Sequence, residues 1–277
     1  MSKTWLITGA SSGFGRLLAE TVLARGDRIV ATVRKPHALA DLQARYGDAA
    51  TVLQLDVRET AAVHAAVAQA FAALGRIDVV VSNAGYGTLG AAEAATEAQV
   101  RAVIDTNLIG SIALIQAVLP GLRQQGGGHV VQVSSEGGQI AYPGFSLYHA
   151  SKWGIEGFVE AVQQEVAGFG IHFTLAEPGP ARTNFGAALV RTHIPTDYAD
   201  TPVGALSRAL DDGSWVIAGD PQRMVDAMIA STEHAPPPRR LVMGASAYHS
   251  IRQALGARLA ELEAQRGIAL STDSPPP

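Results

Sequence analysis

Short apolar runs alternate with stretches of helical periodicity along most of the chain. Between the runs, apolar residues recur every three or four positions, as over 59–74 and 96–125, which predicts helices. Runs that are apolar at nearly every position are typical of a parallel sheet covered by helices on both faces. The pattern therefore predicts an α/β fold. Its seven predicted strands are residues 4–8, 28–33, 51–55, 78–82, 129–133, 171–176 and 239–243.

The same pattern predicts the domain organisation. No linker rich in glycine and serine interrupts the chain, so we expect a single domain over residues 1–270. Periodicity weakens over residues 184–219, a stretch longer than an ordinary connection, and loops of this length often serve as active-site lids. We therefore expect a substrate lid there. The polar, proline-rich residues 271–277 predict a disordered tail.

Composition excludes several classes of protein. The chain has 277 residues, 47% of them hydrophobic and 17% charged, which is enough apolar material for a sizeable core. Its formal charge of −4 lacks the basic excess of a nucleic-acid-binding protein. The absence of cysteine excludes disulfides, thiolate metal ligands and cysteine nucleophiles. We predict no metal site and no nucleic-acid partner.

The sequence also argues against a membrane protein. The residues before the first strand are too few for the apolar core of a signal peptide. The longest uncharged apolar stretch, residues 106–122, contains Asn107, Gln116 and Pro120 and repeats at helical spacing, so it predicts a buried helix. We therefore expect a cytoplasmic protein with no membrane partner.

A glycine-rich turn follows the first predicted strand and precedes a predicted helix. Gly9, Gly13 and Gly15 are spaced Gly-x-x-x-Gly-x-Gly. Glycines at such a junction allow a tight turn and the close approach of a pyrophosphate, which the N–H groups at the helix start stabilise. Glycine also closes ordinary loops, but its place at the first strand–helix junction favours a nucleotide site.

The residue after the second predicted strand bears on the choice of cofactor. Domains that prefer NAD place a carboxylate near this point to bind the ribose 2′-hydroxyl, whereas this chain has Arg34. Arginine can bind the 2′-phosphate of NADP, although Arg34 could also be a solvated surface residue. We favour NADP(H), with Ser11, Ser12 and Arg16 as further candidates for contacts to the phosphate.

Polar residues and glycines end the middle strands of the predicted sheet. Serines at Ser134 and Ser135 lie at a carboxyl end, where open α/β sheets bind ligands. Asn83-Ala84-Gly85 forms a loop suited to close approach of a ligand to the backbone, although Asn83 could instead stabilise the chain bend. Asp56, after the third strand, could simply form a turn.

Asn107 lies inside the predicted helix over residues 96–125. Asparagine is unfavourable in a helix interior because its side chain competes for backbone groups. It could be a core residue satisfied by neighbouring carbonyls, or it could disturb the helix locally and hold a water. The spacing does not decide between these roles.

Tyr148 and Lys152 lie four residues apart in a run with helical periodicity, so they share one helix face. The pKa of free tyrosine is about 10, which makes it a poor base at neutral pH. A nearby cation favours the phenolate form. The pair can therefore carry acid–base chemistry, but a lone Tyr-x-x-x-Lys also occurs by chance, so its context decides.

Taken in order, these pieces resemble the short-chain dehydrogenase/reductase family from Thr4 to about Gly244. Five patterns carry the resemblance, and 13 residues separate Ser135 from Tyr148, as in the family. The patterns are Thr8-Gly9-x-x-x-Gly13-x-Gly15, Asn83-Ala84-Gly85, Ser135, Tyr148-x-x-x-Lys152 and Pro178-Gly179-x-x-x-Thr183. The resemblance implies a single-domain Rossmann fold, a doubly wound seven-stranded parallel sheet in the order 3-2-1-4-5-6-7.

The resemblance also implies roles for individual residues. Tyr148 would be the general acid or base, Ser135 would bind the substrate oxygen, and Asn107 would position a water in the proton relay. Lys152 would bind the nicotinamide ribose and lower the pKa of Tyr148. Two departures stand out: Ser82 replaces a frequent asparagine, and the chain continues beyond Gly244. The implied cofactor-binding residues are Gly9, Ser11, Ser12, Gly13, Phe14, Gly15, Arg34, Asp56, Val57, Asn83, Ala84, Gly85, Tyr148, Lys152, Pro178, Gly179 and Thr183.

The resemblance implies an NADP-dependent carbonyl reductase or alcohol dehydrogenase that works as a homodimer or homotetramer, through helices over 96–125 and 148–168. The surroundings of Trp153 and of Glu177-Pro178-Gly179 are similar to hydroxysteroid and retinol dehydrogenase-like members. Alternatives are a sugar epimerase or dehydratase and a non-catalytic NADP sensor. Aromatic residues favour an apolar or aromatic small-molecule carbonyl substrate, with about half of this set expected in its pocket: Tyr86, Tyr142, Phe145, Phe185, Tyr198 and Trp215.

Overall fold

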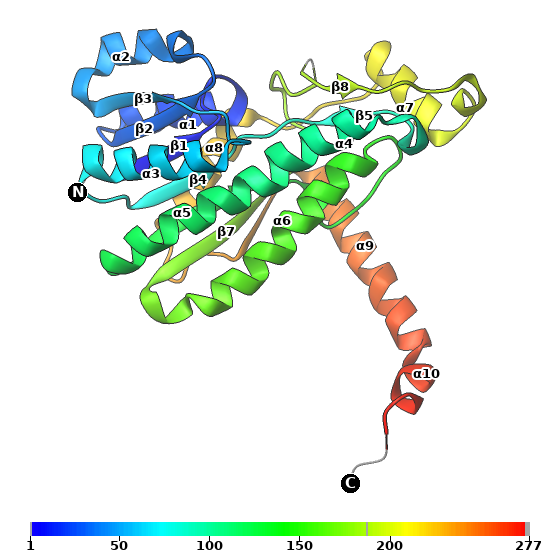
Figure 1. Cartoon of the computed structure of the whole chain (residues 1–277). Coiled ribbons are helices and arrows are strands. Elements are labelled where there is room, and N and C mark those ends of the chain that lie inside the picture. The colour runs from blue at the N-terminus through cyan, green and yellow to red at the C-terminus, as the bar shows by residue number, and fades with distance from the viewer. Residues whose placement is uncertain (1, 187, 275–277) are drawn as a thin grey trace.

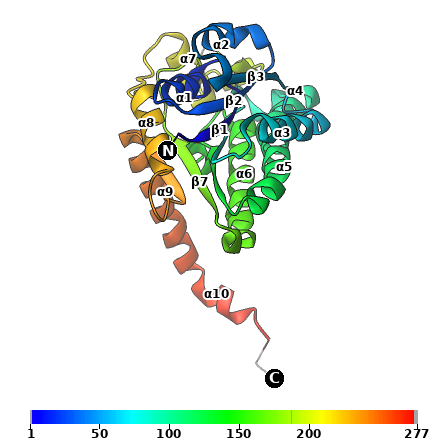
Figure 2. The ribbon, with the colours of Figure 1, turned by 90° about the vertical axis from the view of Figure 1, so that its left-hand side faces the viewer.

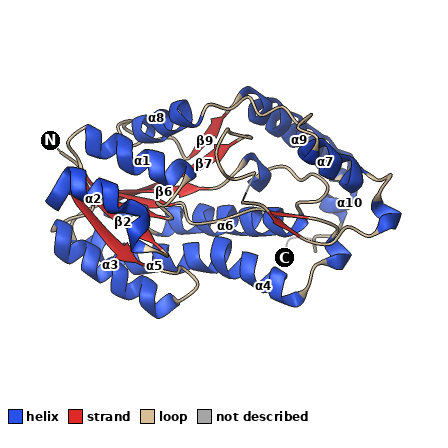
Figure 3. Cartoon of the chain, turned by 90° about the horizontal axis from the view of Figure 1, so that it is seen from above, coloured by secondary structure: helices blue, strands red, loops and turns tan. Residues whose placement is uncertain are grey.

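The computed structural model describes residues 2–186 and 188–274. Its centre is a parallel sheet of seven strands in the order β3-β2-β1-β4-β6-β7-β9 (Figure 3). Counted in chain order within this sheet, that is 3-2-1-4-5-6-7, so the predicted doubly wound fold is confirmed. The strands are β1 (Thr4–Thr8), β2 (Arg28–Val33), β3 (Ala50–Gln54), β4 (Val79–Ser82), β6 (Gly128–Val133), β7 (Ile171–Pro178) and β9 (Arg240–Met243).

Helices cover both faces of the sheet because alternate strand residues point to opposite sides. Leu6 joins the cluster on one face, whereas its neighbours Trp5 and Ile7 join the cluster on the other. The first cluster is covered by α3 (Thr60–Leu74), α5 (Gly110–Gln124) and α6 (Ser146–Glu165). The second is covered by α1 (Gly13–Ala24), α2 (Ala40–Tyr46) and α8 (Pro221–Ser231).

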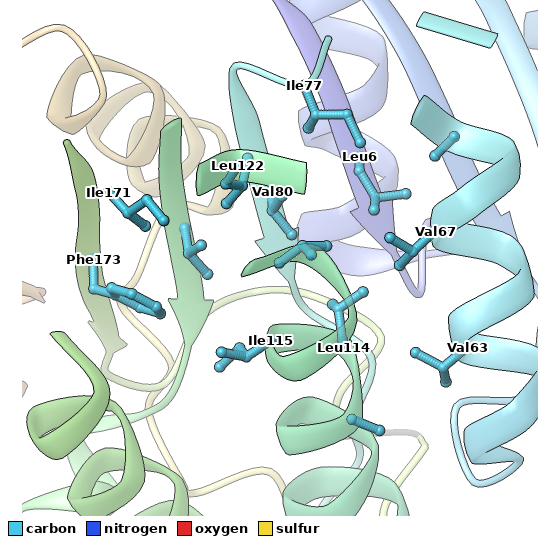
Figure 4. Packing of buried hydrophobic residues seen from close by; sticks show 14 of the residues in the cluster. Leu6, Val63, Val67, Ile77, Val80, Leu114, Ile115, Leu122, Ile171 and Phe173 are labelled. Carbon is cyan, nitrogen blue, oxygen red and sulfur yellow. The ribbon is translucent and has the colours of Figure 1, made fainter. Parts of the chain in front are cut away.

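Figure 4 shows the first of these cores, where strand residues such as Leu6 and Val80 lie between helices. Val67 of α3 and Leu114 and Ile115 of α5 complete it. Fully burying one such aliphatic side chain contributes about 1.5–3 kcal/mol. This packing holds the strand ends, and therefore the polar residues that follow them, in fixed relative positions.

The predicted helix over 96–125 is interrupted. It consists of α4 (Glu97–Ile104), a π turn at Asp105–Ile109 and α5. π turns are rare and often occur at functional sites. By length and composition alone, Glu97–Gln124 could cross a membrane, but seven residues of α5 are buried within the domain, as the sequence predicts.

The predicted lid region contains regular structure that its weak periodicity did not indicate. β8 (Val190–Arg191) pairs in parallel with β5 (Thr88–Leu89) in a separate two-stranded sheet. The helix α7 (Pro202–Asp211) follows. Short 3₁₀ turns occur at η1 (Pro36–Leu39), η2 (Gly47–Ala49), η3 (Ala92–Ala94), η5 (Glu136–Gly138), η6 (Ala167–Phe169) and η7 (Thr196–Tyr198).

The C-terminal helices leave the body of the domain. α9 (Ala245–Ala264) starts beside β9, and α10 (Arg266–Ser271) continues it away from the sheet (Figures 1 and 2). Ser271, the first residue of the predicted tail, is thus the last residue of a helix. Residues 275–277 of that tail lie outside the described residues.

Candidate active site

The glycine turn packs directly against the loop that follows β4. Gly9 has a φ of +66°, and a Cβ there would lie 2.7 Å from the Cα of Ala84. A Cβ on Gly15 would lie 2.5 Å from the amide nitrogen of Asn83. Larger residues are therefore excluded at both positions, which lets the glycine turn pack closely against the loop after β4.

The Asn83 side chain binds protein atoms. Its Nδ2 donates to the carbonyl oxygens of Thr8 (3.0 Å) and Gly9 (3.1 Å). In return, the Thr8 hydroxyl accepts from the N–H groups of Asn83 (3.0 Å) and Ala84 (3.2 Å). These bonds fix the glycine turn to the β4 loop, so the Asn83 side chain stabilises the chain bend.

Asn107 is fully buried at the π turn, and its side chain joins two elements of the site. Its Oδ1 accepts from the N–H of Tyr86 (3.0 Å), and its Nδ2 donates to the Tyr86 carbonyl (2.9 Å) and to the Ser151 hydroxyl (3.1 Å). Ser151 in turn donates to the carbonyl oxygen of Tyr148 (2.7 Å). Asn107 is therefore satisfied by its neighbours and also disturbs the helix, so the two roles that the spacing left open are partly combined.

Tyr148 and Lys152 project from the buried face of α6, and each is only 6% exposed. The Lys152 Nζ lies 5.5 Å from the centroid of the Tyr148 ring and donates to the Val133 carbonyl at 2.9 Å. Ser135 lies just after β6, and its hydroxyl lowers the pKa of the Tyr148 phenol. The fold thus brings Ser135, Tyr148 and Lys152 together, and Asn107 reaches them through Ser151.

Burial dominates the electrostatics of this cluster. It raises the pKa of Tyr148 to about 12, although the Ser135 hydroxyl opposes part of that rise. Burial also lowers the pKa of Lys152 to about 8, with Glu156 opposing. The charges of Glu136 and Glu156 add to the rise in the Tyr148 pKa that burial causes. The lowering of this pKa by Lys152 that the resemblance implies stays a prediction.

A buried ionic network that the sequence analysis missed adjoins the cluster of Ser135, Tyr148 and Lys152 through Glu156 of α6. One guanidinium nitrogen of Arg240 donates to Glu156 (2.6 Å) and Glu177 (2.5 Å). Glu156 also accepts from the Ser134 hydroxyl (2.5 Å). The network ties β9, β7 and α6 to the residue before Ser135. Burial raises the pKa of both glutamates, whereas their hydrogen bonds and charge contacts with Arg240 lower it.

His149 holds the connection between β6 and α6, another role that the sequence analysis did not assign. Its Nδ1 lies 2.9 Å from the Gly137 carbonyl, and its Nε2 accepts from the N–H of Tyr142 at 3.1 Å. This pair of bonds requires the neutral ring with the proton on Nδ1. Burial accordingly lowers the pKa of His149. His149 was adjacent to Tyr148 in sequence, but no spacing rule marked it.

Two arginines flank Asp56 where β2 and β3 end. Arg58 binds the Asp56 carboxylate with both oxygens engaged, at 2.6–3.1 Å. The charge of Arg34 also lowers the pKa of Asp56. Arg58 was not predicted from the sequence. Arg16, a predicted helper, is instead held by Glu20 and Asp41, so its guanidinium serves α1 and α2.

The remaining predicted cofactor residues lie around the same edge of the sheet. The side chain of Thr183 lies 3.9 Å from the position of a Cβ on Gly13, so the loop after β7 faces the glycine turn. Gly179 donates its N–H to the Met243 carbonyl (2.9 Å), and Val57 packs against Gly110. The rest of the predicted cofactor-binding residues are Ser11, Ser12, Phe14, Gly85 and Pro178. Ser11 and Ser12 are exposed to solvent.

The predicted lid region lies against Tyr148. Leu206 of α7 packs with a cluster that contains Leu89 of β5, Phe145 and Tyr148. The Phe185 and Tyr148 rings are 5.6 Å apart, and the Phe145 and Tyr148 rings are 6.2 Å apart. Apolar and aromatic side chains therefore surround the phenol on the side of the lid.

The arrangement fits a nicotinamide dinucleotide. The glycine turn at the start of α1 suits a pyrophosphate, since Gly13 has a φ of +55° and a Cβ there would have only the Thr183 side chain within 4 Å, so its backbone is open to a ligand. Lys152 has three N–H donors, and Val133 takes one of them, which leaves donors for ribose hydroxyls. Ser12 precedes α1 with no side-chain cap bond, so its hydroxyl is also free to bind a phosphate.

Comparison with known proteins agrees with this geometry. The chain is 36% identical to oxidoreductase BOA17 of Botryotinia fuckeliana, over 98% of this chain and 100% of that protein. It is 33% identical to human retinol dehydrogenase 8, over 86% and 80% of the two chains. It is also similar to the structure of a short-chain dehydrogenase from Streptomyces avermitilis, with 38% identity, a TM-score of 0.91 and coverage of 99% and 100%.

More distant structures of the same fold hold NADP or NAD. The family described as short chain dehydrogenase matches residues 3–193, which include every strand from β1 to β8 and all four predicted catalytic residues. This chain belongs to the short-chain dehydrogenase family of oxidoreductases.

Proposed function

We propose that the chain is an NADP(H)-dependent carbonyl reductase or alcohol dehydrogenase that interconverts a ketone or aldehyde with an alcohol. The cluster of Ser135, Tyr148 and Lys152, at the same edge of the sheet as the glycine turn, carries the proposal. The cofactor would supply the hydride, and the protein would supply orientation and the proton.

Tyr148 acts as the proton donor. A phenol with a pKa raised to about 12 is protonated at neutral pH and can donate to the substrate oxygen as negative charge develops there. The Ser135 hydroxyl donates a hydrogen bond to the same oxygen. Burial disfavours the phenolate that alcohol oxidation requires, so the protein atoms alone favour carbonyl reduction.

Lys152 keeps a positive charge close to the Tyr148 ring, because its pKa of about 8 leaves the ammonium mostly protonated at pH 7. That charge stabilises the phenolate that forms when the proton leaves. The Val133 carbonyl holds the Nζ in place, and the remaining N–H groups bind the ribose hydroxyls of the cofactor.

The preference for NADP(H) is supported by positive charge at the ends of β2 and β3. Arg34 and Arg58 both lie near Asp56, and the Asp56 carboxylate is already paired with Arg58. Arg34 makes no ion pair within the described chain, and its guanidinium is available for a 2′-phosphate.

An apolar or aromatic substrate is supported by the surroundings of Tyr148. Tyr142, Phe145 and Phe185, half of the predicted aromatic set, form a connected group of rings with it. The name of the relative retinol dehydrogenase 8 points to an apolar alcohol as well. Phe185 is 38% exposed and Trp215 is 40% exposed, so both rings keep part of their surface in solvent.

The proposal is tested by following NADPH oxidation with a panel of aromatic ketones, in the native protein and in Tyr148→Phe. The variant keeps the ring but loses the proton, so we expect kcat to fall about 10²–10⁴-fold while NADPH binding, measured by fluorescence titration, is unchanged. Turnover near the native rate in Tyr148→Phe would refute the assignment. NADPH binding with no turnover of any ketone by the native protein would support an NADP sensor instead.

A further inference from the structure

Glu136 is a buried carboxyl group that the folded chain leaves without a partner. It follows Ser135 directly and is 6% exposed. Its Oε2 is fully buried and has no hydrogen-bond partner among the described residues. Burial is the only cause of the shift in its pKa, which rises to about 6, so no cation or N–H donor compensates it.

The other two buried glutamates of this region have hydrogen-bond partners. Glu156 and Glu177 share the guanidinium of Arg240, and each accepts a further hydrogen bond, from Ser134 and Gln139 respectively. A buried carboxylate without partners is costly, and native proteins rarely keep one without a functional reason. Folding alone therefore does not account for Glu136.

The position of Glu136 points to a functional reason for keeping this carboxyl group unpaired. The charge of Glu136 raises the pKa of both Tyr142 and Tyr148, so the carboxyl lies within electrostatic reach of the two phenols. Tyr142 and Tyr148 belong to the apolar group beneath the lid. Glu136 also directly follows Ser135, the serine proposed to bind the reacting oxygen, and begins the turn Glu136–Gly138, so its carboxyl group lies beside the proposed site.

We propose that the Glu136 carboxylate binds a hydrogen-bond donor on the substrate, a hydroxyl or ammonium group attached close to the reacting carbonyl. This inference rests on the proposed function and narrows its substrate class to hydroxy- or amino-substituted aromatic ketones. A carboxylate accepts bonds from either group, and an aromatic ring of the substrate would pack against the rings of Tyr142 and Phe145. The donor provides the partner that the protein itself withholds from Glu136.

Three phenyl ketones of nearly equal size test the proposal: 2-hydroxyacetophenone, 2-aminoacetophenone and propiophenone, which carry hydroxyl, ammonium and methyl at the same position. We expect the native enzyme to prefer at least one donor-bearing ketone over propiophenone by about 10-fold or more in kcat/KM. Preference for the ammonium compound would identify a cationic substrate, and preference for the hydroxyl compound a neutral one.

Two substitutions locate that preference. Glu136→Gln keeps an acceptor without charge, so it should retain part of the preference for the hydroxyl compound and lose the preference for the ammonium compound. Glu136→Val should favour propiophenone. The control Glu165→Gln changes an exposed glutamate of α6 and should leave the ratios unchanged. Equal ratios in the native enzyme and Glu136→Val would overturn the proposal.

Thermal unfolding separates recognition from a structural role. Removing an unpaired buried carboxylate should raise the melting temperature, so we expect Glu136→Val to melt about 3 °C or more above the native protein at pH 8. A lower melting temperature, together with unchanged ketone ratios, would assign Glu136 to the scaffold.

Binding measurements that need no turnover test the role of Glu136 separately from the proposed reductase activity. Calorimetric titration of 2-hydroxyacetophenone, 2-aminoacetophenone and propiophenone into the NADP⁺-saturated protein measures the same preference. Tighter binding of a donor-bearing ketone with no NADPH oxidation would refute the reductase alone. Equal affinities for all three in the native protein would refute the role of Glu136.

Discussion

At the scale of single residues, the proposed chemistry depends on how deeply each side chain is buried. The spacing of residues along the sequence does not predict that burial. The four-residue interval between Tyr148 and Lys152 places them on one helix face, but their pKa values, about 12 and about 8, follow from desolvation. Asn83 and Arg16 make the same point, because their hydrogen bonds to other protein atoms were not visible in the sequence. The motifs therefore identified the candidate residues, and the folded structure shows which atoms their side chains contact.

Arg34 tests the choice of cofactor. Arg34→Asp removes the cation proposed for the 2′-phosphate and supplies an acceptor for a 2′-hydroxyl. We expect the ratio of kcat/KM for NADPH to that for NADH to fall about 10-fold or more, which corresponds to about 1.4 kcal/mol. Arg28→Asp, at the opposite end of β2, is the matched control. An unchanged ratio in Arg34→Asp would exclude a role in cofactor choice.

At the scale of elements, the buried network around Arg240 determines how the strand ends meet. Arg240 comes from β9, Glu177 from β7, and Glu156 and Glu160 from α6. The sequence predicted each of these elements, but the residues are far apart in the chain and share no motif. The bond from Ser134 to Glu156 extends the network to the strand that carries Ser135.

Arg240→Met should destabilise the protein strongly, because it leaves Glu156 and Glu177 buried without their cation. Loss of one partner of a buried pair costs about 3–5 kcal/mol. Without arginine, the pKa of these carboxyls lies further above the unfolded value of about 4.3. The Arg240→Met variant therefore keeps its stability at low pH, where both carboxyls are protonated. It loses that stability as the pH rises through the folded-state pKa of these carboxyls.

Chemical denaturation of Arg240→Met should therefore show a larger loss of unfolding free energy at pH 8 than at pH 5. The adjacent Arg239 is exposed, so Arg239→Met serves as the control and should behave like the native protein at both values. A deficit that is equal at pH 5 and pH 8 would contradict the role of Arg240 in lowering the pKa of the two glutamates.

At the scale of the whole molecule, the outer surface of α6 favours an oligomer. Trp153 is 43% exposed, Gly157 is exposed one turn later, and a Cβ on Gly157 would meet no atom within 4 Å. A bare glycine beside an exposed tryptophan suits close approach by a second copy. The homo-oligomer and the cytoplasmic location stay predictions, and the projecting α9 offers a competing surface with exposed Leu255, Leu259 and Leu262.

Two glycine substitutions distinguish these surfaces. Gly157→Glu fits the isolated chain without a clash, so we expect light scattering to show a dimer or tetramer for the native protein and a smaller species for this variant, with an unchanged circular dichroism spectrum. Gly256→Glu, which is equally unhindered on α9, should keep the native mass. The reverse result would assign the interface to α9.

From the sequence, the local pattern predicted the strands and the glycine turn, and the resemblance to the family implied the strand order and the roles of Ser135, Tyr148 and Lys152. The strands and the turn follow from local periodicity, and the rule that parallel strands end at one edge of the sheet places the polar residues after them together. Only the tertiary structure revealed the π turn at Asn107, α7 within the lid, the Arg240 network and the unpaired Glu136. The reason is physical: burial and partnership depend on residues that lie far apart in the chain and meet only when the helices pack on the sheet.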